Sequence, residues 1–122
     1  MYKRQFEQSE TARRLARDAP NNLVSLRGFF ANHDPATRAA LLGSIARDGP
    51  GVTESEARSI AVPTLVIGTA EDTIHPLYFA ESLAAMVPGA HFVRITSKSF
   101  DPVRHAAEFR AALSDFLERV AG

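Results

Sequence analysis

Two segments have the length and composition of β-strands, and this limits the chain to folds built on a small sheet. The run "VPTLVIG", residues 62–68, is apolar and rich in β-branched residues, which suits a buried strand of a parallel sheet. The run "AHFVRI", residues 90–95, is the second. Between them lies a helical stretch that starts at Pro76 and ends at "PG", residues 88–89. The sequence therefore predicts two parallel strands joined by one crossover helix.

Helices are predicted before the first strand from their start signals. Ser9 can cap a first helix, and either Asn21 or Asn22 can cap a second. Asp34 followed by Pro35 predicts a third that runs to about residue 48, because the carboxylate accepts free N–H groups and proline fits the first turn. A short fourth helix is expected near residues 55–59.

The last helix is predicted to start at Asp101 and Pro102, where the same signal recurs. Its apolar residues are expected on the buried side: Val103, Ala106, Phe109, Leu113, Phe116, Leu117 and Val120. The fold class is therefore α/β, with helices followed by β, α, β and α. At 122 residues, the chain is expected to form one compact unit.

The small number of predicted strands raises a physical difficulty. A two-stranded sheet is rarely stable alone, and strands of parallel sheets usually have neighbours on both sides. We therefore expect another chain to supply strands, or the polypeptide to be a portion of a larger fold.

Composition excludes several classes of function. Lys and Arg number 14 and Asp and Glu number 14, so no excess charge points to nucleic acid or an anionic membrane. The chain has no cysteine, which excludes disulfides and thiolate zinc sites. No histidine spacing typical of a metal site is present. No apolar run approaches the length of a membrane span, so a cytoplasmic protein is expected.

The pattern "VPTLVIGTAED…HP…A…LAAMVPGAHFVRI…FRAALSDFL" resembles the C-terminal part of the α/β-hydrolase superfamily. The most specific part is residues 62–87, in which proline, a strand, G-x-x-x-D and a proline-led helix occur together. The resemblance implies a helical cap over residues 1–59. It implies the last strand, helix, strand and helix of a hydrolase core over residues 60–122.

The resemblance places Asp72 at the position of the acid of the catalytic triad, after the penultimate strand. In that role a carboxylate accepts a hydrogen bond from a histidine ring and stabilises the imidazolium during proton transfer. The alternative is that Asp72 only supports the turn before Pro76.

The chain departs from the family pattern at the other catalytic positions. It contains no G-x-S-x-G nucleophile motif. The loop after the second strand reads "TSKSFDP", and Ser99 stands where the triad histidine is expected. His75, three residues after Asp72, is a weak substitute for that histidine, and the alternative is a surface or capping role. Lys98 can bind an anion in the same loop, or remain solvated.

Phe29 and Phe30 are candidates for an acyl-binding pocket in the cap, with core packing as the alternative. No cofactor is implied, because hydrolysis by acyl transfer needs only side chains and water.

Two functions remain open from the sequence. The first is a protein of an ester or similar small-molecule hydrolase lineage that is inactive alone, since nucleophile and histidine are missing. The second is a non-catalytic binding or assembly module that dimerises, or complements an N-terminal subunit, through its open sheet edges.

Overall fold

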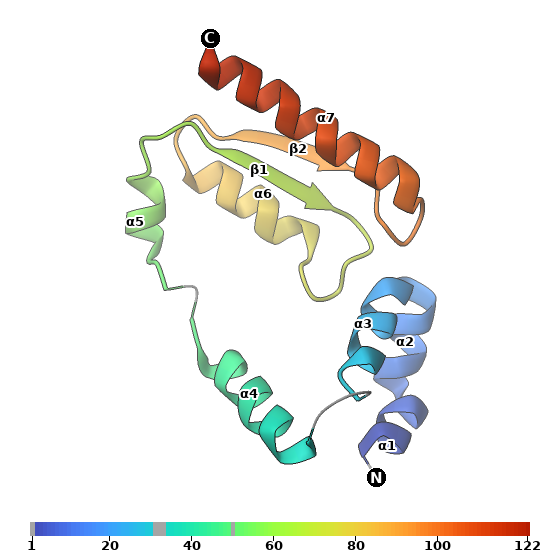
Figure 1. The fold of residues 1–122 in the computed structure, drawn as a ribbon. Helices are drawn as coiled ribbons and strands as arrows, with labels where there is room; N and C mark the ends of the chain where they lie inside the picture. The colour runs from blue at the N-terminus through green and yellow to red at the C-terminus, as the bar shows by residue number, and fades with distance from the viewer. Residues whose placement is uncertain (1, 31–33, 50) are drawn as a thin grey trace. The chain divides into compact units, whose positions relative to one another are not determined.

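The computed structural model describes residues 2–30, 34–49 and 51–122 (Figure 1). Contacts divide the chain into two compact units, Met1–Thr53 and Glu54–Gly122, and each is described by itself. None of the described helices is long and apolar enough to cross a bilayer.

The first unit is helical. Its helices are α1 (Tyr2–Gln8), α2 (Glu10–Asp18), α3 (Pro20–Gly28) and α4 (Pro35–Arg47). The predicted caps at two of them are confirmed, because the Ser9 side chain accepts from the Ala12 N–H and that of Asp34 from the Thr37 N–H. The prediction of an asparagine cap for α3 is wrong. The helix begins at Pro20, since proline has no N–H to leave unsatisfied in the first turn.

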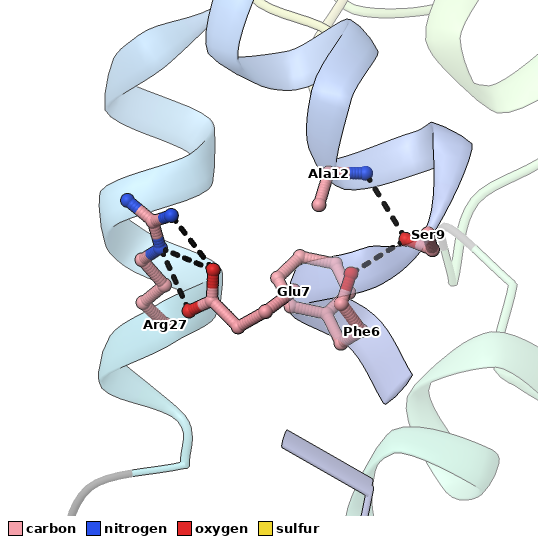
Figure 2. A network of polar contacts seen from close by, with 5 residues as sticks. All are labelled: Phe6, Glu7, Ser9, Ala12 and Arg27. Atoms are coloured by element: carbon pink, nitrogen blue, oxygen red, sulfur yellow. Dashed lines mark hydrogen bonds and ion pairs between the residues drawn. The ribbon is translucent and has the colours of Figure 1, made fainter. Parts of the chain in front are cut away.

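The core of the first unit lies between α2 and α3. It consists of four buried apolar residues, namely Ala12, Leu15, Ala19 and Leu23. Phe6 and Leu26 are partly buried and pack against these four. Figure 2 shows how α1 is held to the other two helices. Arg27 on α3 donates to the Glu7 carboxylate on α1, with 2.7 Å between Nη2 and Oε2. The Ser9 hydroxyl, between α1 and α2, donates to the Phe6 carbonyl at 2.7 Å.

The second unit contains the sheet. Its elements are α5 (Glu54–Arg58), β1 (Leu65–Thr69), α6 (Leu77–Met86), β2 (His91–Ile95) and α7 (Pro102–Ala121). The strands β1 and β2 pair in parallel, with Leu65 opposite His91 and Thr69 opposite Ile95. Asp101 caps α7 by accepting the N–H groups of Val103 and Arg104, as predicted.

The two faces of the sheet are covered by different helices. Gly68 lies against α6, because a Cβ added there would be 2.7 Å from Leu77 Cδ1 and 2.9 Å from Ala80 Cβ. Alternate residues of a strand point to opposite faces, so β2 residues His91, Val93 and Ile95 lie on the other face. These three line a hollow together with residues of α7. The sheet is therefore covered by α6 on one face and by α7 on the other.

The predicted α/β class with a hydrolase-like core is wrong for this structure. The described residues are mostly helical, at 62%, and their sheet has only two strands. A helical region followed by β, α, β and α is compatible with the structure, but no hydrolase core is confirmed. The physical reason is that each strand has five residues, whereas α7 alone has 20.

The prediction that the apolar side of α7 is buried is also wrong. In α7 only Ala112 is buried. Five of its large apolar residues are exposed by 40% or more, namely Val103 79%, Phe109 44%, Leu113 40%, Leu117 55% and Val120 48%. The apolar side of α7 therefore lies beside the surface that contacts the sheet, not on it.

The close approach of α6 to Gly68 gives a stability prediction. Gly68→Val should lower the free energy of unfolding by about 1–3 kcal/mol, because the new side chain overlaps Leu77 and Ala80. The measurement is urea unfolding followed by circular dichroism.

The control is Gly43→Ala in α4, where the added Cβ meets only the Arg47 side chain at 3.6 Å. That change should stabilise the helix by up to about 1 kcal/mol. Equal stability of Gly68→Val and the wild type would contradict the packing described.

Candidate functional site

The carboxyl ends of both strands meet at one edge of the sheet. Because β1 and β2 are parallel, the loop after Thr69 and the loop after Ile95 leave the sheet on the same side. Ligands of open parallel sheets usually bind beyond the carboxyl ends of the strands. This edge is therefore the candidate site.

Asp72 lies in the first of these loops, and its carboxylate is engaged by the backbone. Its Oδ1 accepts hydrogen bonds from the N–H groups of Ile74 and His75, both at 2.9 Å. The preceding Glu71 has a φ of +54°, a left-handed conformation that is uncommon outside glycine. Asp72 therefore supports a tight turn, and this turn fixes the direction of its carboxylate.

His75 lies close to the second oxygen of the same carboxylate. Its Nδ1 is 3.4 Å from Asp72 Oδ2, which is long for a charge-assisted hydrogen bond. The His75 side chain is 82% exposed and that of Asp72 is 24% exposed. Water screens a pair at this position, so the contact contributes little to stability. The structure thus brings Asp72 and His75 together, but on the surface.

Ser99 and Lys98 lie in the second loop. The Ser99 N–H donates to the hydroxyl of Ser97, which is buried, at 3.1 Å. Lys98 is exposed. Within the described residues, the side chains of Lys98 and Ser99 have no hydrogen bond or ion pair. A role of either residue in catalysis or anion binding stays a prediction.

Phe29 and Phe30 belong to the first unit. The ring of Phe30 lies 5.5 Å from that of Phe6, centroid to centroid. Phe29 is 45% exposed. The role of Phe29 and Phe30 in binding a substrate stays a prediction.

The sequence analysis missed a polar clamp at the end of β2. The Thr96 N–H donates to Glu108 Oε2 at 2.6 Å, and the Thr96 carbonyl lies 2.9 Å from His105 Nδ1. Since a carbonyl only accepts, His105 Nδ1 is the donor in this contact. Arg104 Nε donates to Glu108 Oε1 at 2.6 Å. In the first two turns of α7, Glu108 and His105 therefore form a clamp on Thr96, and Arg104 holds Glu108 in place.

The clamp changes the acidity of Glu108. The Thr96 backbone N–H, and then the Arg104 guanidinium, lower the pKa of the Glu108 carboxyl from 4.5 to about 2. Both stabilise the charged form by hydrogen bonding. The only sequence signal for this clamp was the spacing of Arg104, His105 and Glu108 on one side of a helix that directly follows the strand.

A hollow of about 450 Å³ lies between the two loops and the start of α7. Its lining includes two arginines, two glutamates, a buried serine and an exposed aromatic ring, namely Arg94, Arg104, Glu71, Glu108, Ser97 and Phe100. Arg94 forms no ion pair or hydrogen bond with the described residues, whereas Arg104 is held by Glu108. The hollow contains polar groups of both charges.

The described residues lack the parts of a complete hydrolytic site. In residues 2–30, 34–49 and 51–122 no three His, Asp or Glu side chains converge on a point that could hold a metal ion. Asp72 and His75 form a carboxylate and imidazole pair, but no serine is placed against His75 by a hydrogen bond among these residues. The arrangement can orient an imidazole ring, and it supplies no activated nucleophile.

Comparison with protein-family models, curated proteins and solved structures finds no match for this chain.

The clamp predicts how stability depends on pH. The pKa of Glu108 is lower in the folded protein than the ordinary 4.5, so its stabilising effect is complete above about pH 4.5. The effect is lost as the pH falls from 4.5 toward 2. Glu108→Gln should therefore be less stable than the wild type at pH 7, and this difference should shrink as the pH falls to 2.

The measurements are urea unfolding at each pH and an NMR titration of the Glu108 carboxyl. Glu118→Gln is the matched control, because the side chain of Glu118 lies on α7 with no ion pair among the described residues. A Glu108 carboxyl that titrates near 4.5 would contradict the clamp.

Proposed function

We propose that this chain is a non-catalytic assembly module that forms homodimers by completing its sheet, with the cytoplasm as its compartment. The observation that carries the proposal is the two-stranded parallel sheet, whose outer edges are unpaired within the described residues. Unpaired strand edges are templates for pairing with another chain. Closed two-fold dimers are the commonest assemblies of soluble proteins.

Exposed apolar side chains support the same proposal. On the sheet unit they include Phe79 and Leu83 of α6 and four residues of α7. Those of α7 recur along one flank of the helix, and an apolar patch of this kind typically marks an interaction site. Burying it would add a hydrophobic contribution to the hydrogen bonds that the strand edge offers.

The proposal predicts a dimer in solution. Multi-angle light scattering of the purified chain at micromolar concentration should give twice the mass of 13.3 kDa. A stable, well-folded monomer over the same range would overturn it. If the chain associates only with a separate hydrolase N-terminal half, the partner is a complementing subunit and not a second copy.

A second function, in an ester-hydrolysing lineage, is favoured by one observation. The Asp72 carboxylate has one oxygen held by two backbone N–H groups, while the other lies 3.4 Å from an imidazole ring. A triad acid needs such a fixed carboxylate. Turnover of an aryl ester that is abolished by Asp72→Asn would support this function, because asparagine can still accept the turn hydrogen bonds but carries no charge. Inertness of the chain, alone and mixed with a chain bearing G-x-S-x-G, would exclude it.

A further inference from the structure

The hydrogen-bond pattern of the sheet decides which backbone groups of β1 lack a partner. The His91 N–H donates to the Thr64 carbonyl at 2.8 Å, in the register that places Leu65 opposite His91. In a parallel ladder, alternate residues direct their N–H and C=O groups to the same neighbouring strand. The backbone groups of Val66 and Gly68 therefore point to β2. Those of Leu65, Ile67 and Thr69 point outward, where the described residues provide no strand.

The outer edge of β2 is different, because charged residues surround it. Arg94 shares the α6 face of the sheet with Gly68, its register partner. Arg94 is exposed, and it also lines the hollow of about 220 Å³ between β2 and α7. Asp115 and Arg119 of α7 line the same hollow. Charged side chains at an edge are a common protection against strand pairing.

The position of this charged hollow fixes the orientation of α7. The flank of α7 with Glu108, Ala111 and Asp115 lines this hollow beside β2, and no residue of β1 lines it. We define the apolar stripe of α7 as five residues on its other flank, namely Phe109, Leu113, Phe116, Leu117 and Val120. Since the helix crosses the face of a two-stranded sheet, this other flank lies on the side of β1. The apolar stripe therefore lies beside the outward backbone groups of β1.

We infer that a second copy of this chain occupies the outer edge of β1. A two-fold axis perpendicular to the sheet would pair β1 with its copy in antiparallel orientation. Ile67 would then exchange hydrogen bonds with Ile67 of the second copy, and Leu65 of each copy would exchange them with Thr69 of the other. The inference rests on the proposed function and names its interface.

A second copy fits this surface for two reasons. The same axis brings the two α7 helices together on one face of the sheet, with one apolar stripe against the other. The stripe contains no charged residue, so its self-association brings no like charges together. β1 reads "LVIGT" and is uncharged on both faces, as a strand inside a four-stranded sheet must be. The charged edges of β2 would then be the two outer edges of the dimer.

Hydrogen exchange of single amides tests the inference on the unmodified protein. In the dimer the N–H groups of Leu65, Ile67 and Thr69 should exchange slowly, and their protection should fall on dilution together with the dimer fraction. The N–H groups of Phe92 and Arg94 point outward from β2 and are the internal control. They should exchange fast at every concentration.

A charge on the apolar stripe gives an independent test. Leu113→Arg should weaken dimerisation by about tenfold or more, because two buried like charges would meet near the axis. Ala107→Arg is the matched control on the far side of α7, and it should leave the dimer unchanged. Circular dichroism shows whether both variants keep their helices.

The outcomes separate this inference from the proposed function. A dimer with fast exchange at Leu65, Ile67 and Thr69, or one unaffected by Leu113→Arg, would overturn the β1 interface and leave the assembly function standing. Protection at Phe92 and Arg94 in place of β1 would assign the interface to β2. A folded monomer at all concentrations would overturn both.

Discussion

The parallel ladder between β1 and β2 is the interaction on which the second unit depends. It satisfies the inward backbone groups of two five-residue strands and leaves the outward groups of Leu65, Ile67 and Thr69 without a strand partner in the described chain. An unpaired group is tolerable in water and costly when buried under apolar side chains. The exposed apolar stripe of α7 lies on the same side as these groups. Covering the stripe without pairing these backbone groups would be unfavourable, so a single partner must do both.

The clamp on Thr96 connects the sheet to this surface. It holds the first two turns of α7 to the end of β2 through Glu108 and His105, both bonded to one residue. Because α7 is a single helix of 20 residues, fixing its start also fixes the direction of its apolar stripe. The same clamp lines the hollow at the carboxyl ends of the strands. A change at Glu108 would therefore act on both the hollow and the proposed interface.

Local signals in the sequence predicted local structure well. The caps at Ser9, Asp34 and Asp101 depend on hydrogen bonds to residues within four positions, and the structure has all three. The two strands and their crossover were also predicted correctly as elements. The fold class was predicted incorrectly, because the strand pattern suggested a larger sheet than two five-residue strands form. The prediction of the buried side of α7 was wrong, because hydrophobicity identifies an apolar flank but not what covers it.

The candidate site was predictable only in part. The sequence placed Asp72 at the end of a strand, and the structure agrees. Its backbone partners and its surface position depend on how the loop folds, which the sequence pattern does not give. The clamp joins residues 96 and 108 through a packing contact that no short motif encodes. Arg94 lines both hollows beside β2, a placement that depends on the packing of α7 against the strand.

In the proposed dimer, folding of the sheet unit is coupled to its pairing with a second copy. The most direct measurement is the midpoint of thermal unfolding as a function of protein concentration, because association stabilises the folded state by mass action. We expect a midpoint that rises steadily with concentration, and that loses this dependence when α7 carries a charge in its stripe. A midpoint that is the same at every concentration would contradict it.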